Sequence, residues 1–314
     1  MPKFRIAVDM HGGDGGIAVS CRAVTAAAEI LDKNVSFVLC GNENEIKSEF
    51  SKIGSEFQEN CERFSVCNSL PLGDIKSDVS RLWRKAPNSS LVKCISLQKN
   101  KQVNASLSAG DTGALYASSL FLLGREPKID RAALAITIPT ISEKQVVLLD
   151  IGANVECTAK HLFQFAVLGE KYCRKILNLA EKPKIGLLNI GSEAYKGTNA
   201  VKDAAVLIKK RFGCQFAGFI EGDKIFDGEV DVIVCDGFVG NAVLKTSESL
   251  YHFIQKKIGN LLPPDAIKKM QQFNGATYGS SPVLGVKGNV FIAHGNSSVE
   301  ALSCAIVRAV KSLM

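Results

Sequence analysis

The sequence predicts an α/β protein with a largely parallel sheet and helices on both faces. Short runs of Val, Ile and Leu alternate with longer helical stretches from one end of the 314 residues to the other. The runs lack the strict alternation of a half-exposed strand, which is typical of a sheet covered on both faces. Strands separated by helices also favour right-handed crossovers between parallel neighbours. Glycine-rich polar segments follow several runs, at the strand ends where parallel sheets bind ligands.

The expected strands are short and β-branched, and glycine or polar residues bound them. In chain order they are Arg5–Val8, Val35–Leu39, Phe64–Cys67, Ala105–Leu107, Ala133–Ile138, Val146–Ile151, Ile185–Ile190, Gln215–Ile220, Val230–Cys235 and Val290–Ala293.

The segments between them have helical spacing of apolar residues. The expected helices are Ile17–Leu31, Ser89–Gln98, Gly113–Leu123, Thr158–Asn178, Asn199–Arg211, Gly240–Ile258 and Ser297–Leu313. No repeat, low-complexity tract or Pro/Ser-rich linker interrupts the order. We therefore expect one domain, 1–314, of two lobes, with a boundary near Glu126–Ile129 or near Ile141–Lys144.

Residues 250–274 predict a helical hairpin with an apolar, proline-containing turn at its tip. It has two compatible interpretations. The hairpin packs on the body of the protein or on a second subunit, or it is an interfacial segment. In the second case Leu261 and Leu262 enter a bilayer while Lys256 and Lys257 face anionic headgroups.

Composition excludes several classes of protein. Hydrophobic residues make up 46% and charged residues 22%, so the chain is neither disordered nor fibrous. The net charge of +7 is mild, and it suits an acidic partner or an anionic surface better than a coat on DNA. A single tryptophan, Trp83, argues against an aromatic-lined base or sugar surface. We expect no nucleic-acid partner.

The ten cysteines include no CxxC pair and no histidine at zinc-ligand distance, so we expect reduced thiols in the core. The N-terminus enters a strand without a signal-peptide apolar region, and no run of about 18 apolar residues occurs. These features predict a cytosolic protein.

Five strand-to-helix junctions carry the candidate chemistry. Glycine lets backbone N–H groups converge there, Ser, Thr and Asn add donors, and Lys196 and Lys245 add positive charge. Together they predict a phosphate-bearing or other anionic ligand in a cleft between the lobes. The junctions are His11–Gly16, Ser108–Gly113, Gly191–Thr198, Asp236–Asn241 and His294–Ser298.

Standard nucleotide, serine-hydrolase and metalloprotease motifs are missing. There is no GxGxxG, GxSxG or HExxH, and the order Lys196-Gly197-Thr198 differs from a Walker loop. We therefore expect no metal and no cofactor. His161 and His252 have ordinary surroundings in the sequence, whereas His11 and His294 stand at strand ends beside glycine.

Several collinear phrases resemble the bacterial phosphate acyltransferase (PlsX) family of phospholipid synthesis. They cover essentially the whole chain, although the family commonly has Asn where Asp111 stands, and Asp14 is followed here by Gly15-Gly16. The phrases are Ile6–Asp14, Ser108–Ala114, Asp150–Glu156, Gly186–Gly191, Cys235–Asn241, Leu244–Glu248 and Ala293–Gly295.

The resemblance implies a homodimeric acyltransferase with a fold similar to phosphate acetyltransferases and isocitrate dehydrogenases. It implies transfer of a fatty acyl group from acyl carrier protein to inorganic phosphate, the first step of phosphatidic acid synthesis. The family context also implies peripheral membrane association and a functional link to an integral membrane glycerol-phosphate acyltransferase.

Site residues are assigned as hypotheses. His294, Lys245 and Asn241 are the candidate catalytic residues, and Asp236 is expected to orient a lysine or the histidine. The candidates for binding phosphate or the thioester are Lys196, Gly197, Ser108, Gly110, Thr112, Asn154, Asp236, Gly240, Asn296 and Ser297. Two alternatives stay open: an enzyme of the same fold that uses coenzyme A thioesters, and a non-catalytic scaffold at the membrane.

Overall fold

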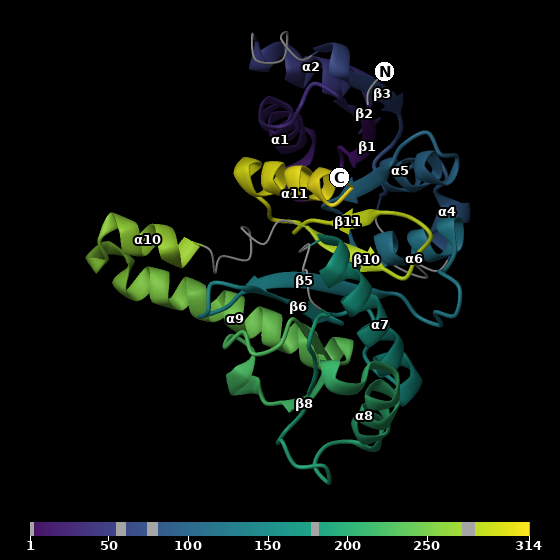
Figure 1. Cartoon of the computed structure of the whole chain (residues 1–314). Helices are drawn as coiled ribbons and strands as arrows, with labels where there is room; N and C mark the ends of the chain where they lie inside the picture. The colour runs from purple at the N-terminus through teal and green to yellow at the C-terminus, as the bar shows by residue number, and fades with distance from the viewer. Residues whose placement is uncertain (1–2, 55–60, 74–80, 177–181, 272–279, 314) are drawn as a thin grey trace. The chain divides into compact units, whose positions relative to one another are not determined.

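The computed structural model describes residues 3–54, 61–73, 81–176, 182–271 and 280–313 (Figure 1). The chain divides into two compact units. Unit 1 comprises Met1–Glu126 and Gly279–Met314, and unit 2 comprises Pro127–Tyr278. The first crossing, at Glu126, falls at one of the two boundaries expected from the sequence. The return of the chain to unit 1 was not expected.

The sheet of unit 1 has the strand order β3-β2-β1-β4-β11-β10. All neighbouring pairs are parallel except β10 and β11, which are antiparallel. The strands are β1 (Phe4–Asp9), β2 (Val35–Gly41), β3 (Phe64–Asn68), β4 (Ala105–Ser108), β10 (Ser281–Leu284) and β11 (Val290–Ile292).

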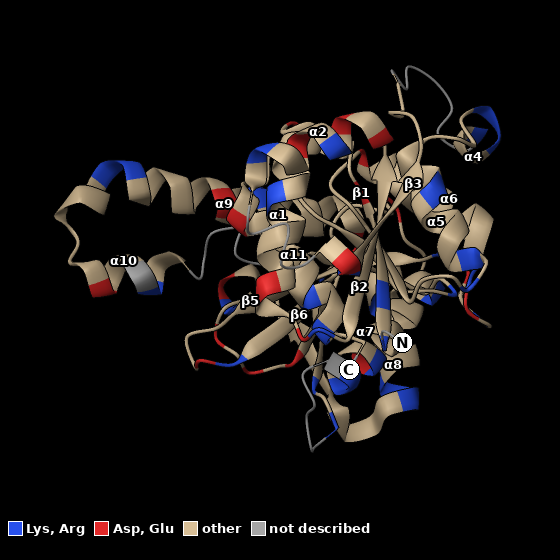
Figure 2. Ribbon diagram, turned by 90° about the horizontal axis from the view of Figure 1, so that it is seen from above, with Lys and Arg blue, Asp and Glu red and all other residues tan. Residues whose placement is uncertain are grey.

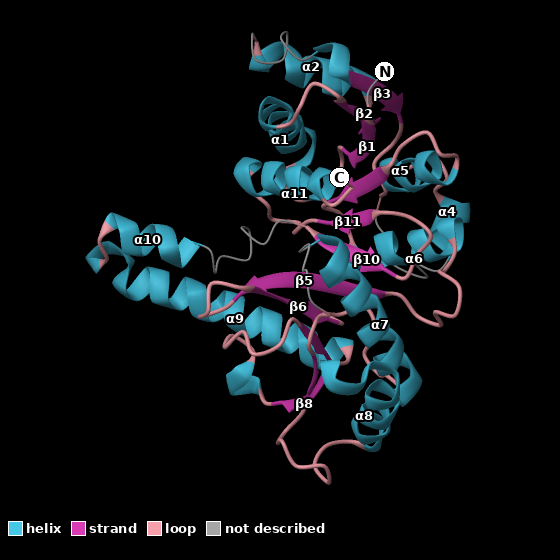
Figure 3. Cartoon of the chain, in the orientation of Figure 1, coloured by secondary structure: helices cyan, strands magenta, loops and turns pink. Residues whose placement is uncertain are grey.

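Helices cover both faces of this sheet (Figure 3). On β1, Ile6 and Val8 belong to a core cluster shared with α1 and α11, whereas Ala7 packs in a second cluster with Cys94 of α5. Both faces of β1 are therefore apolar, which explains its run without alternation. The helices of unit 1 are α1 (Gly16–Ile30), α2 (Glu43–Ile53), α4 (Leu82–Lys85), α5 (Ser90–Lys99), α6 (Thr112–Leu123) and α11 (Val299–Lys311).

Unit 2 has its own sheet, in the order β5-β6-β9-β7-β8, with β5 antiparallel to β6 and the other pairs parallel. The strands are β5 (Ala133–Pro139), β6 (Gln145–Leu149), β7 (Ile185–Leu188), β8 (Phe216–Ile220) and β9 (Val232–Val234). The helices are α7 (Ala159–Ile176), α8 (Asn199–Phe212), α9 (Gly237–Ile258) and α10 (Pro264–Gln271).

The outer part of α9 extends away from the strands of unit 2, and α10 runs back beside it (Figure 1). A short 3-10 turn, Gly259–Leu261, lies between the two helices. The last residues of the expected hairpin, 272–274, lie outside the described residues, as do 177–178 of the expected Thr158–Asn178 helix. Among the residues that the structure describes, no helix is long and apolar enough to cross a membrane.

The predicted fold class is confirmed. Sequence patterns missed α2, α4 and β10 and did not anticipate the two antiparallel pairs. In α2 only Ile46 and Phe50 are buried, so its apolar stripe is too narrow to stand out. The strand β10 contains a proline, Pro282, and it was not predicted because proline is rare in sheets.

All ten cysteines are free thiols. Five are buried and match the expectation of small core side chains, namely Cys21, Cys40, Cys94, Cys173 and Cys235. The expectation is wrong for Cys61, Cys214 and Cys304, which are exposed. Burial raises the pKa of the Cys21 and Cys173 thiols to about 12, so neither is a reactive thiolate at neutral pH.

Candidate active site

In unit 1 a buried aspartate joins the carboxyl ends of the parallel neighbours β1 and β4. Asp9 closes β1, and its Oδ2 accepts a hydrogen bond from the Ser108 hydroxyl of β4 at 2.7 Å. The same hydroxyl accepts the N–H of Gly110 at 3.0 Å. Burial raises the pKa of Asp9, while hydrogen bonds from Ser90, Ser108 and His11 oppose that shift. Ser108 therefore holds the loop that begins α6.

Glycines let the three loops of unit 1 approach closely. A Cβ at Gly12 would lie 2.9 Å from the backbone nitrogens of Ala109 and Gly110. Gly13 has a φ of +84°, and a Cβ there would lie 2.9 Å from the Gly295 carbonyl oxygen. No side chain larger than hydrogen fits these positions without moving backbone.

The polar candidates of unit 1 stand on these joined loops. His294, Asn296 and Thr112 are exposed, and Ser297 is half-buried with its N–H donating to the His294 carbonyl at 3.1 Å. His11 is engaged elsewhere, because its Nε2 accepts the N–H of Asn42 at 3.2 Å at the end of β2.

Unit 2 contains a second buried aspartate at the end of a strand. Asp150 follows β6, and its Oδ1 accepts the N–H groups of Leu134 and Ala153 at 3.0 and 3.1 Å. Its Oδ2 accepts the backbone N–H and the side-chain amide of Asn154 at 2.7 and 2.8 Å. Burial raises the pKa of Asp150, and these hydrogen bonds oppose the shift.

Asn154 holds the loop that follows β6 in place through hydrogen bonds. Its side-chain amide donates to the Ala132 carbonyl at 2.7 Å as well as to Asp150. Both N–H bonds of the amide thus have protein acceptors, and its assignment as a phosphate-binding residue stays a prediction.

The first turn of α9 packs directly against the Asp150 loop. A Cβ at Gly240 would overlap the Asp150 carbonyl oxygen, and one at Gly237 would lie 2.7 Å from the Asn154 carbonyl oxygen. A Cβ at Gly152 would lie 3.6 Å from Oδ1 of Asn241. Asn241 is therefore placed over the loop by the close approach of the helix.

Asn241 and Lys245 lie one turn apart on the same exposed face of α9. Lys245 forms an ion pair with Glu248 at 2.9 Å. An amide and an ammonium group at this spacing offer several hydrogen-bond donors and one positive charge to an anion.

The loop after β7 carries the second lysine. Asn189 holds this loop by donating from its side chain to the carbonyls of Gly191 and Lys196, each at 3.2 Å. Gly197 has a φ of +90°, and a Cβ there would overlap the Asn189 amide. The Lys196 ammonium group contacts Glu193 at 2.8 Å, and this hydrogen bond raises the pKa of Lys196.

At four of the five junctions a side chain caps the helix that follows, whereas α1, whose N-cap is Gly15, has no side-chain cap. Asp236 accepts the N–H of Val239 at 2.9 Å, so capping is the interaction that the structure shows for Asp236. The N–H of Gly237 donates to the Asn154 carbonyl at 2.7 Å. Two backbone donors at the start of α9 thus have acceptors within the chain, so an anion bound there would rely on side chains more than on the backbone donors expected from the glycines. The equivalent caps are Asp111, Thr198 and Ser298.

Exposed apolar side chains border the polar loops of unit 2. They are Val155 (65% exposed), Ile190 (79%), Tyr195 (74%) and Phe238 (68%). These residues follow β6, follow β7 or begin α9, at the carboxyl edge of three neighbouring parallel strands. The same edge thus offers anion-binding groups beside an apolar surface.

The predicted site residues fall into three groups. Unit 1 holds Ser108, Gly110, Thr112, His294, Asn296 and Ser297. Unit 2 holds Asn154, Lys196, Gly197, Asp236, Gly240, Asn241 and Lys245. The hairpin residues Lys256, Lys257, Leu261 and Leu262 lie at the other end of α9 from Asn241.

Sequence reasoning missed the residues that build the loops, namely Asp9, Asp150 and Asn189. Their shared signal is a polar residue at the end of an apolar strand with glycine within three positions. Within the described ranges, no cluster of three or more His, Cys, Asp or Glu side chains has the geometry of a metal site.

Solved structures with the same architecture identify the fold. A phosphotransacetylase from Streptococcus pyogenes superposes with a TM-score of 0.66 and 15% identity over 99% of this chain and 94% of that chain. A 4-hydroxythreonine-4-phosphate dehydrogenase from Klebsiella pneumoniae gives 0.58 and 12% over 99% and 98%. The chain thus has the phosphotransacetylase fold.

Sequence relatives identify the family. The family model described as "Fatty acid synthesis protein" matches residues 4–314. A phosphate acyltransferase from Dictyoglomus turgidum is 36% identical over 96% of this chain and 92% of the relative. One from Campylobacter fetus subsp. fetus is 38% identical over 98% and 93%. The chain belongs to the phosphate acyltransferase family and is an acyltransferase, which confirms the resemblance.

Proposed function

We propose that this enzyme transfers a fatty acyl group from acyl carrier protein to inorganic phosphate and so produces the acyl phosphate that begins phosphatidic acid synthesis. The observation that carries this proposal is the carboxyl edge of unit 2. There the anion-binding pair Asn241 and Lys245 and the Lys196 loop stand beside exposed apolar side chains. One reactant is a small anion and the other carries a long apolar chain.

The reaction needs no nucleophilic side chain. A phosphate oxygen attacks the thioester carbonyl, a carbon–oxygen bond forms, the carbon–sulfur bond breaks, and the thiolate leaves and takes up a proton. Phosphate at neutral pH is already anionic. Holding both reactants in register is worth roughly 7–11 kcal/mol, and one oxyanion donor is worth about 3–4 kcal/mol.

The proposed roles follow the chemistry of each side chain. Lys196, Asn241 and Lys245 bind phosphate. His294 or Asn296 polarises the thioester carbonyl or protonates the leaving thiolate, since both are exposed polar groups on the joined loops of unit 1.

A direct assay tests the function. Purified enzyme incubated with palmitoyl acyl carrier protein and phosphate is expected to form acyl phosphate, detected by trapping with hydroxylamine. Palmitoyl coenzyme A, assayed in parallel, distinguishes the rival donor. Turnover with coenzyme A thioesters alone would refute the proposed donor, and no acyl phosphate from either thioester would refute the reaction.

We further propose that the enzyme is a cytosolic homodimer that associates with the membrane periphery through the hairpin. It would then supply its labile product to an integral membrane glycerol-phosphate acyltransferase. Leu261 at the tip is 80% exposed, and Lys256 and Lys257 lie in the last turn of α9. Figure 2 shows basic residues on this outer part of α9. Apolar side chains beside lysines suit an anionic bilayer surface.

The double variant Leu261→Glu with Leu262→Glu is expected to lose most of its flotation with anionic liposomes, because two carboxylates resist insertion. Val206→Glu on α8 is the matched control, since Val206 is also an exposed apolar residue of unit 2. Undiminished flotation of the double variant would exclude the tip as the anchor.

A further inference from the structure

The far end of α6 carries an aromatic and basic surface that the proposed chemistry does not use. Trp83 of α4 stacks on Phe121 of α6 with ring centroids 6.2 Å apart and an interplanar angle of 25°. The Arg84 guanidinium lies 4.5 Å from the centre of the Trp83 ring. Phe121 is 54% exposed, although a phenylalanine on a helix next to a sheet usually faces the core.

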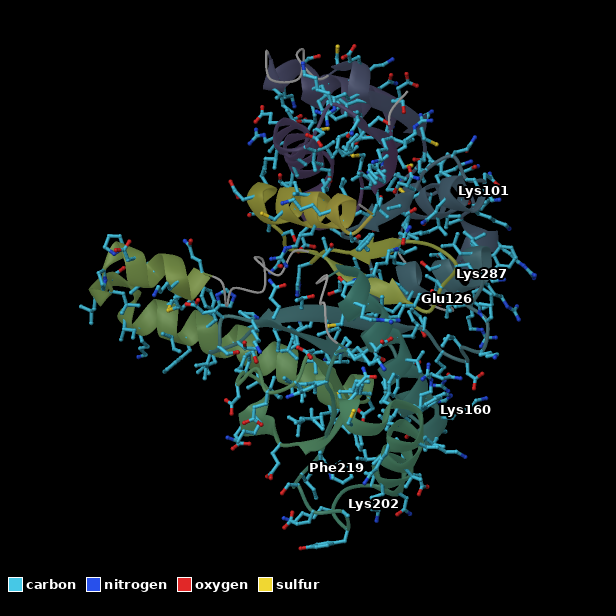
Figure 4. All side chains as sticks on the ribbon, viewed as in Figure 1. Lys101, Glu126, Lys160, Lys202, Phe219 and Lys287 are labelled. Atoms are coloured by element: carbon cyan, nitrogen blue, oxygen red, sulfur yellow. The ribbon has the colours of Figure 1, made fainter. Side chains whose placement is uncertain are left out.

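Two lysines continue this surface along the same unit. The N–H of Lys287 donates to the Gly124 carbonyl, just beyond α6, at 2.9 Å. The N–H of Lys101 donates to the Gln98 carbonyl at 2.9 Å, and the Gln98 side chain bonds the Asn289 carbonyl at 3.1 Å. Figure 4 shows Lys101 and Lys287 on one side of unit 1, and Glu126, the last residue before unit 2, near Lys287.

We call this surface the α4/α6 patch. All four of its cationic side chains are exposed, and Trp83 is half-buried. The patch consists of Trp83, Arg84, Lys85, Lys101, Phe121 and Lys287.

We infer that the α4/α6 patch is the docking surface for an acidic acyl carrier protein, an inference that rests on the proposed function. Trp and Arg are enriched among the residues that dominate the binding energy of protein interfaces, Phe is enriched in interfaces generally, and exposed lysines steer an oppositely charged partner. The patch has both components on unit 1 (Figure 4).

The position of the patch fits delivery of a tethered thioester. Helix α6 runs from Thr112, on the joined loops of unit 1, to Leu123 beside the patch. Its 12 residues span about 18 Å. A carrier bound at the far end of α6 would therefore stand one helix length from the polar loops. A carrier protein presents its acyl group on a long flexible prosthetic arm, which suits such a separation.

A lipid surface is the weaker candidate occupant. Membrane anchors insert apolar side chains beyond the headgroups. The Trp83 ring is instead covered by contacts with Phe121 and Arg84, which fix its position. A fixed aromatic surface with exposed cations matches a folded acidic protein.

The test compares the wild type with a double variant that carries both Arg84→Glu and Lys85→Glu. The double variant is expected to raise both the Kd for acyl carrier protein and the KM for its palmitoyl thioester by about 10- to 100-fold. The KM for phosphate and kcat at saturating carrier should stay unchanged. The difference from wild type should shrink as salt screens the charges.

The matched control is Lys209→Glu with Lys210→Glu. It reverses the charge of another adjacent pair of exposed basic residues in the last turn of a helix, α8, and should leave the Kd for the carrier unchanged. Thermal unfolding of both variants verifies that they fold. An unchanged Kd and KM for the carrier in the Arg84/Lys85 variant, with wild type active on that carrier, would overturn the docking surface alone.

Two further outcomes are informative. Loss of liposome binding by the Arg84/Lys85 variant without a change in carrier Kd would overturn the inference in favour of a lipid contact. A wild type that transfers acyl groups only from coenzyme A would refute the proposed donor, whatever the variant does.

Discussion

Replacement of Lys245 by alanine is expected to lower kcat/KM for phosphate about 10- to 100-fold. The ammonium group stands one turn from Asn241 on the exposed face of α9, where it can form a charge-assisted hydrogen bond with a phosphate oxygen. A hydrogen bond to a charged group is worth about 1.5–3 kcal/mol, which corresponds to that loss in rate. Initial rates at varied phosphate and saturating acyl donor measure it.

Stability should change little in the same variant. The Lys245–Glu248 ion pair is on the surface, where such pairs contribute roughly 0–1 kcal/mol. Lys224→Ala is the matched control, because Lys224 is equally exposed at 49% and pairs with Asp227 at 3.1 Å with the same sequence spacing. Equal phosphate kinetics in the Lys245 and Lys224 variants would remove Lys245 from the site.

A methyl group at Gly240 is expected to destabilise unit 2 and to abolish most of the activity. The Cβ of Gly240→Ala would overlap the Asp150 carbonyl oxygen, so α9 must move away from the loop that it positions. Overpacking of a buried contact costs about 1–3 kcal/mol, and the displacement moves Asn241 as well. Urea unfolding and acyl phosphate formation measure the two effects.

Gly259→Ala, at the outer end of α9, supplies the comparison. Its Cβ would meet only the Gln255 side chain at 3.6 Å, an ordinary contact, and its φ of −54° suits alanine. This variant should be as stable as the wild type and fully active. If the Gly240→Ala variant has the same stability to urea and the same rate of acyl phosphate formation as the Gly259→Ala variant, the close approach of α9 to the Asp150 loop does not matter for the site.

Local patterns were sufficient for much of this fold. The run Ile6–Val8 reads as a strand because both of its faces are buried. Helix α9 reads as a helix because apolar residues recur at helical spacing in its second half, at Leu250, Phe253, Ile254 and Ile258. Three of these, Leu250, Phe253 and Ile258, are exposed in the structure. The antiparallel pair of β5 and β6 could not be predicted in this way. Both strands have the composition of buried parallel strands, and only the short turn between them implies a hairpin.

The strand-to-helix junctions could be located from the sequence, because glycine and polar residues follow the apolar strands. That these junctions bind an anion stays a prediction. The close approach of Gly237 and Gly240 to the Asp150 loop joins residues far apart in the chain, and no spacing in the sequence encodes it. The hydrogen bond between Asp9 and Ser108 likewise joins two strands. The cap from Asp236 and the bonds between Asp150 and Asn154 are local, three or four residues apart, so these roles could have been recognised from the sequence.

The discontinuous course of unit 1 has a consequence for biosynthesis. On the ribosome, unit 2 emerges as one uninterrupted stretch, so all of its strands are made before β11 and α11. Unit 1 needs these two later elements, because β11 pairs with β4 and α11 packs on α1. The nascent chain therefore carries an unfinished N-terminal half, with the apolar side of α1 uncovered, until α11 has been made.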